Sequence, residues 1–177
     1  HQMDVKGAYL NTPIDKEIFV AQPPGYEQLS TDGKRLTCRL IKSLYGFKQS
    51  GRLWYGTLTT FLQELGFTQS KNDPCLFSRD TATLMFWVDD IVVASSCESE
   101  ITDIKSQLSE RFRMDDRGEL KWFLGIDFKR APDGCYTANQ ERYVRAVLER
   151  FGMTECKPVA TPIDPAVKLT PVTGDNE

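Results

Sequence analysis

Residues 84–94, which read LMFWVDDIVVA, constrain the fold more than any other part of the sequence. Nine of these eleven residues are apolar, and the other two are the adjacent acids Asp89 and Asp90. Apolar runs of this kind are typical of buried strands, yet a carboxylate desolvated without a partner costs on the order of several kcal/mol. Two interpretations fit: a β-hairpin turn, where Asp is common, or a site where a divalent cation neutralises both acids.

Three helices are predicted from apolar residues that recur at helical spacing. The first spans residues 50–65, the second has Ser96 or Ser99 as its N-cap, and the third begins after Asn139 and ends at Gly152. The residues expected along their apolar faces are Leu53, Trp54, Leu58, Phe61, Leu62 and Leu65; Ile101, Ile104, Leu108 and Phe112; and Tyr143, Val144, Val147, Leu148 and Phe151.

Short strands are predicted between these helices, bounded by Gly, Pro and Asp. Residues 2–10 are expected to form a strand that runs into a short turn or helix, and residues 17–40 a hairpin with a polar loop at 30–33. The other predicted strands are residues 76–77, 83–88, 91–95, 122–128 and 135–138, the last two joined by a turn at 132–134. This order predicts an α+β fold, with an antiparallel sheet that has helices on one face.

The cysteines and the single histidine limit which metal a site could hold. The five cysteines are widely spaced with no C-x-x-C pair, and His1 is the only histidine, so a zinc site is not expected. Reduced cysteines in an intracellular protein are the expectation. A metal site in this chain would be built from carboxylate oxygens, which favour Mg²⁺, Mn²⁺ or Ca²⁺.

The net charge of −3 and the pI of about 5.3 count against a simple nucleic-acid binder. The charge is uneven, however, because residues 34–55 carry six basic residues, no acidic one and several aromatic rings. No apolar run approaches the roughly 20 residues that span a bilayer, and no membrane association is expected. The chain begins at His1 rather than Met and is expected to be an internal piece of a longer protein.

A third carboxylate, Asp4, lies at the end of another apolar β run, in QMDVKGAYL. Phosphoryl transfer by two metals needs carboxylates that hold both ions roughly 3.5–4 Å apart. Adjacent residues on a strand point to opposite faces, so Asp89 and Asp90 alone serve this poorly. Asp4 on a neighbouring strand would complete the set; the alternative is an ordinary surface Asp or a helix cap.

Four blocks of sequence, in this order, resemble the reverse transcriptase of copia-type LTR retrotransposons over residues 1–162. They are QMDVKGAYLNTPIDKEIFVAQPPGYE, RLIKSLYGFKQSGRLWY, FWVDDIVVA and LKWFLGIDF. The resemblance implies the palm of a right-hand polymerase, with Asp4, Asp89 and Asp90 as catalytic residues. It implies two Mg²⁺ or Mn²⁺ ions held mainly by Asp4 and Asp89, with Asp90 in support and the Val5 carbonyl as a further ligand.

The same resemblance assigns residues that bind substrate. Tyr9 occupies the steric-gate position, where a ring leaves no room for a 2′-hydroxyl; the alternative is a core aromatic. The residues implied to contact the nucleotide are Lys6, Gly7 and Ala8 at the triphosphate, and Tyr45, Gly46, Phe47, Lys48 and Gln49 beneath the base. Those implied at the primer and template are Trp87, Leu124 and Gly125. Trp87 replaces the usual Tyr before V-D-D, and Ser50-Gly51 replaces the usual Ala-Pro.

The resemblance also implies a domain plan and partners. Residues 1–120 would form the palm with a fingers hairpin inserted at about 15–42, residues 121–160 the primer-grip hairpin and the start of the thumb, and residues 161–177 a linker. The expected partners are an RNA or DNA template with its primer, dNTP, and the RNase H and integrase parts of a Pol polyprotein. The expected location is a cytoplasmic virus-like particle, with the nucleus as the alternative.

Two other functions compete with RNA-directed DNA polymerisation. A palm that has lost activity, or been co-opted, would bind nucleic acid or a protein partner. A nucleotide cyclase would also use paired carboxylates, but the LYGFKQ and FLG blocks have no role there. Primer extension on an RNA template discriminates between these hypotheses.

Overall fold

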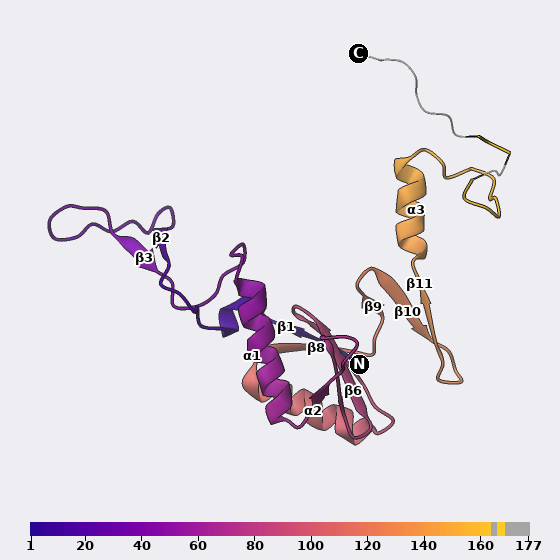
Figure 1. Cartoon of the computed structure of the whole chain (residues 1–177), viewed down its shortest axis with the longest axis horizontal. Coiled ribbons are helices and arrows are strands. Elements are labelled where there is room, and N and C mark those ends of the chain that lie inside the picture. Colours follow the sequence, from indigo (N-terminus) through magenta and orange to yellow (C-terminus); the bar gives the residue numbers. More distant parts are fainter. Residues whose placement is uncertain (164–165, 169–177) are drawn as a thin grey trace, which may run out of the picture.

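The computed structural model describes residues 1–163 and 166–168, and Figure 1 shows its helices and strands along the chain. The elements are β1 (Gln2–Val5), the 3-10 helix η1 (Ala8–Asn11), β2 (Phe19–Ala21), β3 (Thr37–Arg39), α1 (Ser50–Glu64), β4 (Thr68–Gln69), β5 (Leu76–Arg79), β6 (Ala82–Trp87), β7 (Asp90–Ala94), α2 (Glu98–Arg111), β8 (Met114–Gly118), β9 (Trp122–Phe123), β10 (Ile126–Arg130), β11 (Tyr136–Asn139) and α3 (Glu141–Arg150).

The central feature is a six-stranded sheet with the order β4-β5-β6-β7-β1-β8. All five neighbouring pairs are antiparallel. The first strand of the chain therefore lies between β7 and β8, which come much later in the sequence. This insertion places β1 beside the β6–β7 hairpin, the region of the adjacent acids.

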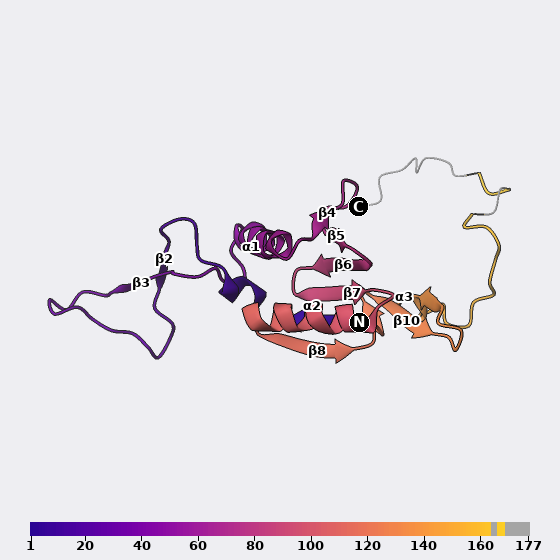
Figure 2. The same ribbon diagram turned by 90° about the horizontal axis from the view of Figure 1, so that it is seen from below.

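One face of this sheet is buried under α1 and α2. Residues on β6 alternate strictly, with Ala82, Leu84 and Phe86 buried and the residues between them more exposed. The buried residues of β1, β6, β7 and both helices form one core cluster. The predicted apolar stripes of the first two helices are confirmed, and so is an antiparallel sheet with its helices on one face (Figure 2).

Two smaller sheets project from this core, as Figure 1 shows. The β2–β3 hairpin extends to one side and confirms the hairpin predicted over residues 17–40, with Leu29 bridged to Arg35 around its polar loop. On the other side, β9, β10 and β11 form a three-stranded sheet that leads into α3. Neither hairpin contributes to the buried cluster of the central sheet.

Several predicted boundaries are wrong. Residues 122–128 do not form one strand, because Leu124 and Gly125 have φ values of 49° and 80° and turn the chain between β9 and β10. The N-cap of α2 is Cys97, whose N–H donates to the Ser95 hydroxyl, rather than Ser96 or Ser99. The strand β8 was not predicted at all.

The third helix is amphipathic, as predicted, but its apolar face is not covered. No residue of α3 is buried, and Tyr143, Val144 and Phe151 are exposed. Its N-cap is Gln140, while the Asn139 side chain accepts a hydrogen bond from the Glu141 N–H. The predicted linker begins in residues 161–163, which form no helix or strand, and residues 164–165 and 169–177 lie outside the described part.

None of the helices in the described part of the chain combines the length and the apolar character that a membrane-spanning helix needs.

Candidate active site

A row of side chains crosses four strands on the open face of the central sheet. Trp87 on β6 lies opposite Asp90 on β7, Asp90 lies opposite Asp4 on β1, and Asp4 lies opposite Asp115 on β8. Directly opposed side chains have their Cβ atoms about 5 Å apart, and like charges in this position are destabilising. The three carboxylates in this row therefore repel one another, and a cation bound among them would relieve the repulsion.

Asp89 lies in the two-residue loop that joins β6 to β7. The loop begins at Val88, whose φ of 55° is a backbone conformation that β-branched residues rarely adopt. Two contacts hold it: the buried Trp54 indole N–H donates to the Val88 carbonyl at 2.6 Å, and the Val5 N–H donates to the Asp89 carbonyl at 2.8 Å. The second contact ties the loop directly to the strand that carries Asp4.

The electrostatics of the row centre on Asp4, whose side chain is 20% exposed. Burial raises the pKa of Asp4, the nearby Arg117 guanidinium lowers it, and the charges of Asp89, Asp90 and Asp115 raise it further. Arg117 donates from Nη2 to Asp4 Oδ1 at 2.8 Å, and its Nη1 lies 3.8 Å from Asp90 Oδ1. A cation is therefore already placed against two of the three predicted catalytic acids.

The donor set suits the divalent cations that the sequence predicts. Carboxylate oxygens are the ligands that Mg²⁺ and Mn²⁺ prefer, and the guanidinium against Asp4 and Asp90 shows that a positive charge is accommodated there. In the conformation of the described residues, however, no three His, Cys, Asp or Glu side chains form a group that could hold a metal ion. Metal binding requires the carboxylates to turn toward a common point.

Beside the acids, Tyr9 and Tyr45 form an aromatic pair with ring centroids 4.5 Å apart. Burial raises the pKa of Tyr45, and the charge of Asp89 raises it further. Tyr9 also borders an apolar cavity of about 150 Å³ whose lining includes Trp54 and Trp87. The predicted gate residue thus contacts both the core and the predicted nucleotide-binding block.

The predicted anion-binding turn after β1 is formed around Gly7, whose φ is 62°. The Lys6 N–H donates to the Arg113 carbonyl at 2.8 Å. The Lys6 ammonium pairs with Asp115 at 2.9 Å. Lys6, one of the three residues predicted to present N–H groups to a triphosphate, therefore already donates its backbone N–H within the protein.

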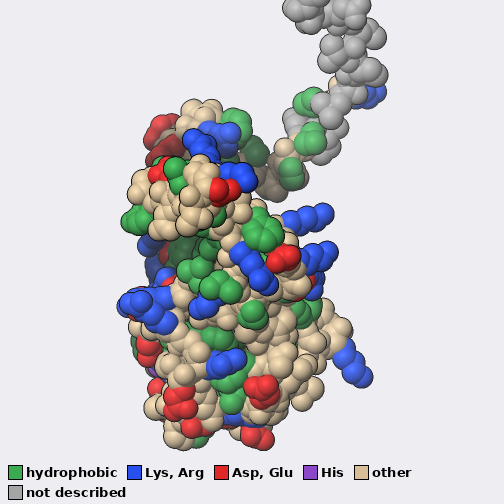
Figure 3. Space-filling view, turned by 90° about the vertical axis from the view of Figure 1, so that its left-hand side faces the viewer, with side chains coloured by type: hydrophobic (Ala, Val, Ile, Leu, Met, Phe, Trp, Pro, Cys, Tyr) green, Lys and Arg blue, Asp and Glu red, His purple; other side chains and the backbone are tan. Residues whose placement is uncertain are grey.

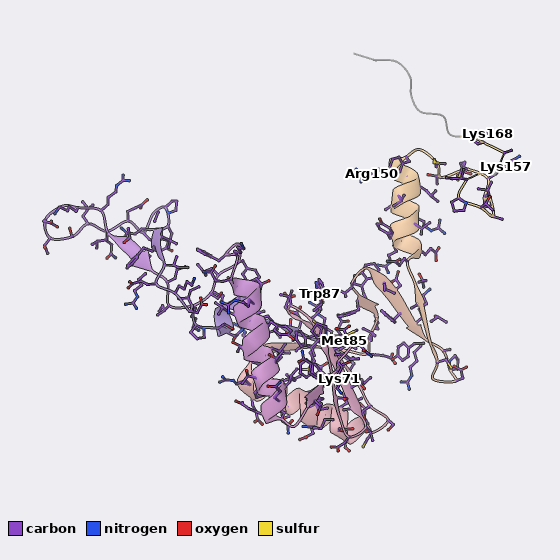
Figure 4. The ribbon with its side chains drawn as sticks, in the orientation of Figure 1. Lys71, Met85, Trp87, Arg150, Lys157 and Lys168 are labelled. Carbon is purple, nitrogen blue, oxygen red and sulfur yellow. The ribbon has the colours of Figure 1, made fainter. Side chains whose placement is uncertain are left out.

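The remaining predicted site residues lie in the loop before α1, at the end of β6 and in the turn between β9 and β10. Gly46, with a φ of 90°, turns the exposed loop before α1, and Lys48 and Gln49 line a hollow of about 390 Å³ with Asp15 and Arg52. Figure 4 labels Trp87, which is 57% exposed at the end of β6, and Met85 on the same strand. Within the described chain, no side-chain hydrogen bond or ion pair joins the β9–β10 turn, Leu124 and Gly125, to the acids.

Four residues that shape the site were not predicted to do so. They are Arg117 and Asp115 on β8, Gln2, whose Nε2 donates to Asp90 Oδ1 at 3.1 Å, and Trp54, which was predicted only as core. Trp54 and Gln2 lie within predicted elements, but their hydrogen bonds to Val88 and Asp90 depend on the folded structure. Arg117 and Asp115 carry no local signal, since β8 itself is polar.

The site therefore consists of opposed acids on neighbouring antiparallel strands, next to a two-residue hairpin loop. The sequence model of the family described as "Reverse transcriptase (RNA-dependent DNA polymerase)" matches residues 1–165. The chain therefore belongs to the reverse transcriptase family. The resemblance predicted from the four sequence blocks is confirmed.

Several individual members of this family are similar to the chain over nearly its whole length. The chain is 36% and 37% identical, over 98% and 96% of its length, to the retrovirus-related Pol polyproteins from transposons RE1 and RE2 of Arabidopsis thaliana. It is 34% identical over 96% of its length to the corresponding polyprotein from transposon TNT 1-94 of Nicotiana tabacum. The chain spans only 12% to 13% of the length of these relatives.

The hydrogen bond from Trp54 to the hairpin loop predicts a stability difference between two tryptophans. Trp54→Phe removes the indole donor to the Val88 carbonyl, so we expect the free energy of unfolding to fall by about 1–3 kcal/mol. The control Trp122→Phe, at a half-exposed ring, is expected to lower it by less than about 1 kcal/mol. Urea denaturation measures both; equal losses would show that the loop contact contributes nothing.

Proposed function

We propose that this chain is the metal-binding palm part of an RNA-directed DNA polymerase, which adds deoxynucleotides to a primer 3′-hydroxyl. The observation that carries the proposal is the placement of Asp4 directly opposite Asp90, with Asp89 in the adjoining loop. Membership of the reverse transcriptase family supports it. Two further features agree: Tyr9 packs against Tyr45 near the acids, and a turn at Gly7 follows Asp4.

The chemistry assigns a role to each group. In the proposed reaction the primer 3′-oxygen bonds to the α-phosphorus of the nucleotide while the bond to pyrophosphate breaks. Asp4 and Asp89 would hold the two divalent ions, with Asp90 and the Val5 carbonyl in support. Bound there, such ions lower the pKa of the attacking hydroxyl and neutralise the leaving phosphates. The carboxylates position this charge, and the buried Trp54 fixes the loop that presents Asp89.

Substrate contacts are proposed around the acids. Gly7 and its neighbours would face the triphosphate, Tyr9 the sugar, and the Tyr45–Gln49 block the base. Trp87 would contact the primer terminus with its exposed ring, since aromatic faces stack on bases without sequence preference. The turn at Leu124 and Gly125 would support the primer strand from the β9–β10 hairpin.

Nucleic acid is also proposed to contact the end of the molecule from which β2 and β3 project. Figure 3, which faces this end, shows Lys and Arg side chains along both sides of the view. The six basic residues of residues 34–55 are all exposed. Three of them pair with nearby acids: Lys34 with Asp32, Arg39 with Glu17, and Arg52 with Asp15. The other three, Arg35, Lys42 and Lys48, form no ion pair among the described residues. A template strand would meet these three cations.

We further propose that the chain acts inside a Pol polyprotein, together with RNase H and integrase parts, in a virus-like particle. The names of its relatives as Pol polyproteins, of which it spans a small share, support this proposal. A second candidate function is a palm without catalysis that binds nucleic acid or protein. The ion pair of Arg117 with Asp4 favours it, since the acids are partly neutralised within the protein.

Primer extension on an RNA template tests the proposal. A longer protein that includes this chain and its flanking polymerase segments is expected to extend a DNA primer with Mg²⁺ or Mn²⁺. Residues 1–177 alone are expected to extend it poorly, because further cations are needed to position the triphosphate. If the longer protein binds template and primer but does not extend, the second candidate replaces the first.

A further inference from the structure

Arg117 holds an unusual place against the acids of the central sheet. Its guanidinium hydrogen-bonds to Asp4 at 2.8 Å and lies 3.8 Å from Asp90. The two carboxylate side chains are 20% and 30% exposed, whereas the Arg117 side chain is 51% exposed. The cation therefore lies on the solvent side of the acids, where it can leave without disturbing the core.

The strand that carries Arg117 is built to aim it there. Gln2 pairs with Gly118 and Met3 pairs with Asp116, so Arg117 is an extra residue with no partner on β1. Such a β-bulge redirects a side chain. The bulge is fixed by Gly118, with a φ of 72° and an N–H that donates to Asp116 at 2.9 Å, and by Lys105, which pairs with Asp116 at the same distance.

The contacts of the Arg117 guanidinium indicate that it compensates the charge of the acids rather than stabilising the fold. Among the described residues its hydrogen bond and ion pairs go only to Asp4 and Asp90, and Asp90 accepts its hydrogen bond from Gln2 instead. Ion pairs with a half-exposed partner contribute little to stability. By contrast, three acids in one row repel one another when no cation is present.

We propose that Arg117 is an internal counter-cation that competes with divalent metal for Asp4 and Asp90. The guanidinium occupies the acids before a metal ion arrives and leaves them when the ion binds. The affinity of the site for metal is then set partly by Arg117. This inference rests on the proposed function, because it concerns the same carboxylates.

Mn²⁺ binding to the 177-residue chain tests the competition, with free Mn²⁺ counted by its electron paramagnetic resonance signal. Because displacing a surface ion pair no longer opposes binding, Arg117→Gln is expected to bind Mn²⁺ about threefold to tenfold more tightly than the original chain. Arg113→Gln is the matched control, since it removes the same charge from the residue just before the same strand, where no ion pair to these acids is formed among the described residues. Its affinity is expected to change by less than about twofold.

Two further variants separate this inference from the proposed function. In Asp4→Asn/Arg117→Gln the gain in affinity is expected to disappear, since one competing carboxylate is gone. Unchanged or weaker Mn²⁺ binding in Arg117→Gln, with weaker binding in Asp4→Asn, overturns the competition but leaves the metal site standing. Unchanged binding in both Asp4→Asn and Asp89→Asn instead overturns the proposed metal site.

Thermal unfolding provides a second readout and guards against a misfolded variant. Without metal, Arg117→Gln is expected to melt at a lower temperature than Arg113→Gln, and added Mn²⁺ is expected to raise its melting temperature by more. If Arg117→Gln does not fold, Arg117→Lys is tested in its place, since Lys retains the charge but loses the planar fork. It is expected to bind Mn²⁺ more tightly than the original chain, by less than the gain expected of Arg117→Gln. Equal Mn²⁺ responses in the Arg117 and Arg113 variants overturn the inference.

Discussion

Replacement of Asp89 by Asn is expected to lower primer extension by about a thousandfold or more, because several kcal/mol of metal-borne charge stabilisation is lost. Asn preserves the size of the side chain but lacks the charge that would hold a divalent ion. The fold is expected to survive, since within the described chain the Asp89 side chain makes no hydrogen bond and the loop is held through its backbone. The measurement is the rate of dNTP addition by a polymerase that includes this chain.

The matched control is Asp103→Asn, an exposed acid on α2 whose closest ion pair, with Arg79, is 4.0 Å long. Its extension rate is expected to stay within about twofold, because weak surface ion pairs contribute little. Circular dichroism of both variants would establish that they remain folded. If a folded Asp89→Asn variant extends primers as fast as the Asp103→Asn variant, the catalytic assignment of the hairpin is wrong.

The second large effect is expected at Tyr9. Tyr9→Val should raise the use of ribonucleotides relative to deoxynucleotides by at least about tenfold, because overpacking a rigid site costs roughly 1–3 kcal/mol and 1.4 kcal/mol is a tenfold rate. The ring is held between Tyr45 and the core beneath the hairpin, so it cannot move aside freely. The ratio of kcat/KM for rNTP and dNTP in each variant measures the effect.

A core role for Tyr9 predicts a different outcome. The control Tyr55→Val removes another ring that packs against the same cluster and whose hydroxyl donates to the Pro74 carbonyl. It is expected to lower the melting temperature while leaving the nucleotide ratio unchanged. Should Tyr9→Val do the same, with both nucleotides used less in proportion, the gate assignment fails and Tyr9 is structural.

The parts of the fold that were predicted correctly are those with a strong local signal. The helix over residues 50–65 differs from α1 by one residue at its end, because its apolar stripe is long and Gly66 stops it. The hairpin around Asp89 was predicted from two apolar runs flanking a pair of acids. Placing Asp4 beside it depended on the family resemblance, since nothing local joins residues so far apart.

Most of the features that were not predicted depend on pairing between strands that are far apart in the sequence. The strand β8 reads MDDRG, with neither alternation nor β-branched residues, and it becomes a strand only because β1 offers it an open edge. The contact of Arg117 with Asp4 follows from a bulge in that pairing, so it has no signature in the sequence. The break between β9 and β10 was missed because Leu124 takes a backbone conformation usual for Gly or Asn.

The insertion of β1 between β7 and β8 also has a consequence for how the chain folds. Gln2 is 88 residues away from its hydrogen-bond partner Asp90, and Asp4 is 113 residues away from Arg117. The β5–β6 and β6–β7 hairpins close locally, whereas β1 must wait for both of its neighbours, and such long-range pairing is slow. A chain that has been synthesised only as far as α2 therefore has no β8, the strand that carries Asp115 and Arg117. One edge of β1 is then unpaired and open to other chains.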